Sequence, residues 1–362
     1  MNEKRKNLLT VLLAGGFVLV FLFWSIFKPD AQRSVTERRA LAQRPELTAG
    51  SVLSGKFMTD FESYTLDQFP LREDFRALKA FTALDVFRRL DNDGLYCDRG
   101  YLSKLDAALD EASVDNAAER FRRVYEHYLG GGKIYLAVVP DKNYYTSDEY
   151  PKLDYDALIS RITQRMDYAT YIDLTGSLRL ESYYHTDPHW DQAELLPAAR
   201  TILQAMGAEQ RDSYRTLRLD TPFYGAYYGQ YALPVQPDEL RFLTSGTLEA
   251  CRVYDYETDR WGSVYDPDKA AGDDGYEVFL DGSRSLLRIE NPNASTTREL
   301  VIFRDSYGSS LAPLLVEGYA AVTLVDIRYL SPELLGRFVK FADQDVLFLY
   351  STTVLNSSGV LK

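Results

Sequence analysis

Histidine and cysteine are scarce in this sequence, and their scarcity limits the catalytic, metal-binding and disulfide chemistry that the protein can have. The 362 residues include three histidines and two cysteines. Disulfide-stapled scaffolds and structural zinc sites both need several closely spaced Cys or His ligands, so we expect neither class. The spacing of Cys97 and Cys251 leaves open whether they pair. We also expect no cofactor.

An excess of basic residues is missing as well. The formal net charge is −12, whereas binding to nucleic-acid phosphates needs clustered Lys and Arg. Nucleic acid is therefore excluded as a partner. The apolar fraction of 46% is that of a globular protein. The chain is long enough for one large domain with an insertion, or for two ordinary domains.

One long apolar run lies near the start of the chain. Residues 8–27 carry no charge and follow Lys4, Arg5 and Lys6. This length suffices to cross the hydrocarbon core of a membrane as a helix, and no small-x-small cleavage pattern follows it. We expect an uncleaved anchor over residues 1–27, with a cytoplasmic N-terminus and the rest of the chain extracytoplasmic. Residues 28–75 then form a juxtamembrane stalk with short helical pieces, and residues 76–362 the main domain.

The main domain alternates between two patterns. Continuous apolar runs at residues 133–140, 300–303, 321–326 and 346–350 are typical of strands buried on both faces of a parallel sheet. Segments of helical periodicity separate them, so the pattern predicts an α/β fold. Residues 217–290 differ, because short aromatic runs there alternate with Gly, Pro and Asp turns. We predict a β-rich insertion in that segment.

A neutral-pH general base is most often histidine, and one segment offers a good candidate. His127 falls on the polar side of a predicted helix, whereas His185 and His189 lie together in YYHTDPHWD. In an extended segment residues i and i+2 share a face, so Asp187 can fix the tautomer of the His189 ring. Taken alone, a D-x-H pattern is more often a surface turn that contains a hydrogen-bonded, non-catalytic histidine.

A serine at a strand end supplies the nucleophile candidate. Ser306 follows an apolar strand and precedes a helix, which places it at the sheet edge where α/β proteins bind ligands. The N–H groups of Ser306, Tyr307 or Gly308 at the helix start could hold an oxyanion. Taken alone, this segment is also explained by Asp305 or Ser306 capping the start of the helix. Together the two segments predict a Ser306, His189, Asp187 catalytic set.

A metal site is the alternative reading of the histidine segment. Its imidazole and carboxylate side chains alternate on one extended face, as metal ligands can. No further histidine lies elsewhere in the predicted α/β core to complete the set, so we expect no metal. The four residues concerned are His185, Asp187, His189 and Asp191.

At these residues the chain resembles the DHHW family of bacterial surface proteins. This family is related to the alginate O-acetyltransferase proteins and their SGNH-hydrolase-like domain. The resemblance rests on four stretches: SVTERRALAQRPEL after the anchor, TDPHW at 186–190, RDSY at 304–307 and VDIRY at 325–329. It implies a three-layer, SGNH-hydrolase-like α/β domain with a mainly parallel sheet.

The resemblance also implies a function. Ser306 would carry an acetyl group, His189 would act as base and Asp187 would orient it. The acetyl group would pass to a cell-surface or exported polysaccharide, or to water, so the chain would be an O-acyltransferase or an O-acetylesterase. A multi-span membrane-bound acyltransferase would be the donor partner. The alternative is a non-catalytic, glycan-binding scaffold of a polysaccharide modification or export complex. Candidates for substrate contact are Trp190, Lys142, Asn143, Arg304 and Tyr228.

Overall fold

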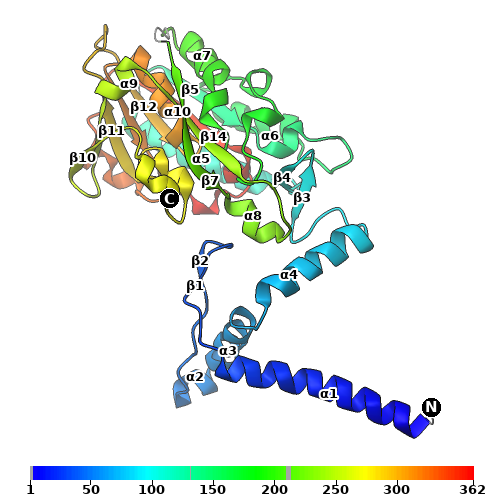
Figure 1. Ribbon diagram of the computed structural model, residues 1–362. Coiled ribbons are helices and arrows are strands. Elements are labelled where there is room, and N and C mark those ends of the chain that lie inside the picture. The colour runs from blue at the N-terminus through cyan, green and yellow to red at the C-terminus, as the bar shows by residue number, and fades with distance from the viewer. Residues whose placement is uncertain (1–2, 131, 209–212) are drawn as a thin grey trace. The chain divides into compact units, whose positions relative to one another are not determined.

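A computed structural model describes residues 3–130, 132–208 and 213–362, which fall into two compact units (Figure 1). The first unit comprises Met1–Asn92 with Gly229–Pro234, and the second comprises the remainder. The first two residues of the expected anchor lie outside the described part. The division after Asn92 falls beyond the boundary that we expected at residue 75.

The first unit is helical apart from one short strand pair. Its first helix, α1 (Glu3–Phe27), is long and apolar enough to cross a membrane. The other elements are β1 (Arg33–Ser34), β2 (Arg39–Ala40), α2 (Ala49–Leu53), α3 (Lys56–Asp67), α4 (Arg72–Phe81) and the π-helical turn η1 (Thr82–Val86). Asp67 ties the pieces together, because it accepts hydrogen bonds from Arg39 at 2.6 and 2.8 Å and from the Ala42 N–H at 2.8 Å.

The second unit is built on an eight-stranded sheet. Its strand order is β10 (Arg260–Gly262), β9 (Arg252–Asp255), β11 (Leu286–Glu290), β13 (Ala321–Val325), β12 (Glu299–Arg304), β14 (Asp345–Ser351), β5 (Ile134–Val139) and β6 (Thr170–Ile172). Pairing is parallel from β13 to β6, whereas β11, β9 and β10 continue the other edge in antiparallel pairs. The sheet is therefore mainly parallel, as predicted.

Successive residues of the central strands point into two separate cores, which makes the unit three-layered. On β12, Ile302 packs in the core that contains α7 (Leu196–Ala205) and α10 (Gly308–Leu315). Phe303 packs in the core of α5 (Glu111–Tyr128) and α6 (Tyr155–Arg165). Helices thus cover both faces of the sheet (Figure 1). The predicted α/β fold is confirmed.

The expected β-rich insertion at 217–290 is only partly an insertion. β7 (Arg215–Phe223) and β8 (Asp238–Thr244) pair with each other, apart from the main sheet. Strands β9 to β11, however, extend the main sheet. On β11 Leu286 and Leu287 enter opposite cores, so this strand is buried on both faces like its parallel neighbours. Two helices, α8 (Ala226–Tyr231) and α9 (Gly246–Ala250), also fall within the segment.

Shorter elements complete the unit. A hairpin of β3 (Leu95–Asp98) and β4 (Tyr101–Lys104) precedes α5, and α11 (Thr352–Leu355) follows β14. The 3-10 turns are η2 (Lys142–Tyr145), η3 (Thr175–Ser177), η4 (Leu180–Ser182), η5 (Gln192–Glu194), η6 (Pro267–Ala271), η7 (Gly275–Val278), η8 (Val316–Gly318), η9 (Pro332–Arg337) and η10 (Ser358–Val360).

The central strand should carry much of the stability of this unit. Ile302 is fully buried, so Ile302→Ala should lower the free energy of unfolding by about 2–5 kcal/mol through lost burial and a residual cavity. Arg260→Ala, at an exposed position on the edge strand β10, should change it by less than about 0.5 kcal/mol. Urea unfolding followed by circular dichroism measures both. Equal effects would contradict the central position of β12.

Candidate active site

A tight turn at the end of β12 holds Ser306. The strand ends at Arg304, and α10 begins at Gly308. Between them the Asp305 carboxylate accepts the N–H of Tyr307 at 3.0 Å and the N–H of Ser351 at 2.7 Å. Asp305 therefore fixes the turn from inside and joins it to the end of the neighbouring strand β14. Ser306 is left at the carboxyl edge of the sheet.

Ser306, His189 and Asp187 form a continuous hydrogen-bonded chain. Ser306 Oγ lies 2.8 Å from His189 Nε2, and His189 Nδ1 lies 2.6 Å from Asp187 Oδ1. The same Asp187 oxygen accepts the backbone N–H of His189 at 3.0 Å, while Oδ2 accepts the N–H of Ala226 at 2.9 Å. The structure thus brings together the three residues that the sequence singled out.

The Asp187 carboxylate is buried yet held in its charged form. Burial alone would raise its pKa. The charge of His189, the hydrogen bond from its ring and the N–H groups of Ala226 and His189 outweigh that effect, and they lower the pKa of Asp187 to about 2. The carboxylate is therefore ionised at neutral pH and can stabilise a positive charge on the imidazole.

A second buried aspartate, Asp238, holds the loop that carries Asp187. It stands at the start of β8 and accepts the N–H of His185 at 2.6 Å and the N–H of Thr186 at 2.8 Å. The Thr186 hydroxyl and the His185 ring also contact it, at 2.6 and 2.9 Å. Sequence reasoning missed Asp238, because a lone Asp some 50 residues away gives no local signal.

Sequence reasoning also missed Gly225, whose role becomes clear only in the folded structure. A Cβ at this position would lie 2.2 Å from the Cβ of Asp187, so only glycine permits this approach. Its N–H donates to the Thr186 hydroxyl at 2.9 Å. The next residue, Ala226, supplies the N–H that binds Asp187. The segment before α8 therefore packs directly against the acid.

Tyr276 sets the plane of the His189 ring. The two rings stack at 3.9 Å with an interplanar angle of 9°. The Tyr276 hydroxyl lies 2.8 Å from Ser310 Oγ, which also accepts the Trp190 Nε1–H at 2.7 Å. Tyr276 stands on η7, in the segment predicted as strands, which concealed it from sequence reasoning.

The expectation that Tyr307 and Gly308 offer oxyanion donors is wrong. The Tyr307 N–H donates to the Asp305 carboxylate at 3.0 Å, and the Gly308 N–H donates to the Asp305 carbonyl at 3.1 Å. Both groups therefore stabilise the turn itself. A short cap of this kind competes with ligand binding for the same N–H groups.

Four of the five candidates for substrate contact are buried, which corrects their expected role. Trp190 and Arg304 are fully buried, and Asn143 donates to the Tyr96 hydroxyl at 2.7 Å. Lys142 Nζ donates to the carbonyls of Tyr184 and His185 at 2.8 and 3.3 Å, and burial lowers its pKa to about 8. These side chains support the site from within. Tyr228 is partly exposed, and its contact with substrate stays a prediction.

The alternative of a metal site is not supported by the contacts of its four residues. The His185 ring contacts Asp238, while Asp191 pairs with Arg241. Asp187 and His189 bind each other. Among residues 3–130, 132–208 and 213–362, no group of three or more His, Cys, Asp or Glu side chains is arranged to hold a metal ion.

The second unit has the mainly parallel, three-layer α/β fold that the family resemblance implied. Residues 152–325 match the model of the DHHW family, described as DHHW protein. The matched segment contains Asp187, His189 and Ser306. The relationship to the DHHW family predicted from the sequence is therefore confirmed for this segment. No protein of curated function matches the sequence.

Solved structures share the fold. A DHHW family protein from Eubacterium siraeum is 22% identical with a TM-score of 0.60, and the match covers 72% of this chain and 91% of that one. PatB1 from Bacillus cereus is 14% identical with a TM-score of 0.58, covering 72% of this chain and 96% of that one. A second PatB1 structure, with a sulfonyl adduct, gives the same identity and TM-score.

The low pKa of Asp187 predicts an acid-side loss of stability. An unfolded Asp has a pKa of about 3.9, so the native carboxylate contributes on the order of 2 kcal/mol above that pH. This contribution should disappear as the pH falls from about 4 through about 2. Asp187→Asn should be less stable than the unchanged protein at pH 7, by a difference that shrinks over this window.

Urea unfolding at a series of pH values measures this difference. Asp156→Asn is the control, because this carboxylate is exposed at the start of α6. Its unfolding free energy should follow that of the unchanged protein at every pH. A pH-independent deficit in Asp187→Asn would show that the native and unfolded pKa values are equal.

Proposed function

We propose that this chain is an extracytoplasmic O-acyltransferase or O-acetylesterase that works through an acyl group on Ser306. The observation that carries the proposal is the unbroken chain from Ser306 Oγ through the His189 ring to the Asp187 carboxylate, at 2.8 and 2.6 Å. A serine needs an adjacent base to become a nucleophile, and the base needs an orienting group. Each is present at hydrogen-bond distance.

The chemistry follows from these contacts. Ser306 Oγ attacks the carbonyl carbon of an acyl ester, and its proton passes to His189 Nε2. The imidazolium then gives this proton to the departing alcohol oxygen, which leaves an acyl group on Ser306. An acceptor hydroxyl or water attacks in the second half, with His189 again as base and then acid. Asp187 stays ionised and stabilises the imidazolium throughout.

The family relationship supports acetyl as the transferred group and a cell-surface or exported polysaccharide as the acceptor. The helix α1 supports a membrane-anchored location, since it is long and apolar enough to span a bilayer. We propose a cytoplasmic N-terminus, with Lys4, Arg5 and Lys6 on that side of the membrane. The catalytic unit then lies outside the cytoplasm, and the acyl donor has to be delivered across the membrane. A multi-span acyltransferase is the partner that we propose for this step.

Removal of the nucleophile tests the proposal. Ser306→Ala should lower the hydrolysis rate of 4-nitrophenyl acetate by about 10³-fold or more, because the covalent route is lost. Ser309→Ala is the matched control, since it changes a buried serine three residues further along the same segment. Its rate should stay within about threefold of the unchanged protein. Equal rates in all three proteins would exclude a seryl intermediate.

The close approach of Gly225 gives an independent test of Asp187. Gly225→Ala places a methyl group into the space of the Asp187 side chain, and a displacement of about 1 Å can cost about 10²-fold in rate. We expect a fall of this size in kcat with esters. Gly176→Ala is the control, because a Cβ there meets no atom within 4 Å. An unchanged kcat in Gly225→Ala would argue that Asp187 has no part in turnover.

A further inference from the structure

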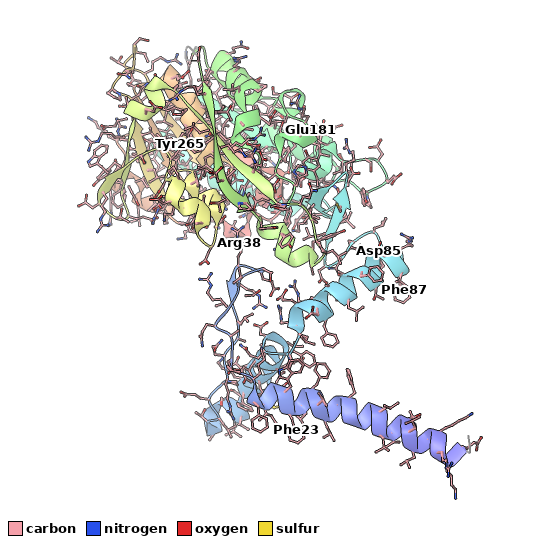
Figure 2. All side chains as sticks on the ribbon, in the orientation of Figure 1. Phe23, Arg38, Asp85, Phe87, Glu181 and Tyr265 are labelled. Atoms are coloured by element: carbon pink, nitrogen blue, oxygen red, sulfur yellow. The ribbon has the colours of Figure 1, made fainter. Side chains whose placement is uncertain are left out.

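The first unit exposes many large apolar side chains for its size. From Lys56 to Phe87, ten such residues are at least one-third exposed: Met58, Phe61, Leu66, Phe69, Leu71, Phe75, Leu78, Phe81, Val86 and Phe87. We call this set the stalk patch. Phe87 projects outward from the chain, as Phe23 does from α1 (Figure 2). Soluble monomers rarely expose apolar surface on this scale, so a partner surface is expected.

The stalk patch is in contact with the helix proposed to span the membrane. The Phe21 ring of α1 stacks on Phe69 at 5.4 Å with an interplanar angle of 2°, and it meets Phe75 edge-on at 5.7 Å. Phe69 and Phe75 also contact each other at 5.5 Å. The N-terminal end of α4 is therefore fixed beside the C-terminal part of α1.

The position of Phe21 along α1 sets how deep its partners Phe69 and Phe75 lie in the membrane when α1 spans it. Phe21 lies six residues before the helix end at Phe27, which is about 9 Å at 1.5 Å per residue. Amphipathic helices that lie on a bilayer bury their apolar face by about 5–10 Å. With α1 across the membrane, Phe69 and Phe75 thus come to the depth of the interface. The stalk patch continues from this point along α4.

Charge supports the same partner. Residues 28–90, which follow the proposed span, hold 11 Lys and Arg and 9 Asp and Glu, a net charge of +2. Residues 91–362 hold 27 Lys and Arg and 43 Asp and Glu, a net charge of −16. The segment next to the span is therefore slightly basic within an acidic protein, and anionic lipid headgroups attract Lys and Arg near the surface by about 1 kcal/mol each. The basic pair Arg88–Arg89 directly follows Phe87.

We infer that the stalk patch is a second membrane-binding surface, with α3, α4 and η1 lying in the interface of an anionic bilayer beside α1. This inference rests on the proposed anchor. It adds that the segment between the span and the catalytic unit is held on the lipid rather than extended away from it.

Spin-label depth measurements on the full chain in nanodiscs of phosphatidylethanolamine and phosphatidylglycerol test the inference. Single labels are placed at Leu78→Cys on the stalk patch and at Glu73→Cys on the opposite side of α4. Cys97→Ser removes the partly exposed native thiol, while Cys251 is buried, and burial raises its pKa to about 12, so it should react slowly. The Leu78→Cys label should collide more often with oxygen than with a water-soluble nickel complex, and Glu73→Cys should show the reverse.

A third label at Val18→Cys on α1 separates failure of this inference from failure of the anchor. Lipid exposure at Val18→Cys with water exposure at Leu78→Cys would overturn the inference alone. Water exposure at both would overturn the anchor as well. A label at Leu78→Cys shielded from both reagents would show a covering protein, either a second copy or a partner, and would overturn the lipid assignment. Ester hydrolysis by the same samples reports on the catalytic proposal separately.

Discussion

The hydrogen bond between Asp187 and His189 is the interaction on which the site depends. It requires a carboxylate that is buried and still ionised, which is costly unless several donors surround it. The structure supplies the His189 ring and two backbone N–H groups at 2.6 to 3.0 Å. Asp238 fixes the loop from one side and Gly225 admits the neighbouring segment from another. The geometry at Ser306 follows, because Tyr276 and the Asp305 turn orient the other two groups.

The sequence predicted the parts of this site that depend on local spacing. Asp187 and His189 are two residues apart, and Ser306 directly follows a buried strand, so both could be placed without a structure. The supporting residues could not, because they act across long stretches of chain: Asp238 and Tyr276 meet the histidine loop only after folding. The prediction of Tyr307 and Gly308 as oxyanion donors failed for a related reason. The periodic pattern located the helix start, but it did not show that the Asp305 side chain accepts the Tyr307 N–H and that the Asp305 carbonyl accepts the Gly308 N–H.

The fold was predictable where strands are buried on both faces and so read as continuous apolar runs. This rule found β5, β12, β13 and β14. It missed β9 to β11, because their alternating and aromatic sequences look like an independent β structure, although they extend the same sheet. Residues 28–75 were predicted as a juxtamembrane stalk with short helical pieces, but no clear period set the bounds of these pieces. The structure gives α2, α3 and the start of α4 there, and Phe69 and Phe75 contact α1.

The central claim is that Ser306 carries the acyl group, and the most direct measurement is to locate that group. The full chain is mixed with 4-nitrophenyl acetate, quenched in acid during turnover and digested, and its peptides are sequenced by mass spectrometry. The account predicts one acetyl group on Ser306, and none on this peptide when His189 is replaced by alanine. Turnover with the acetyl group on another residue, or with no protein-bound acetyl group at all, would contradict it.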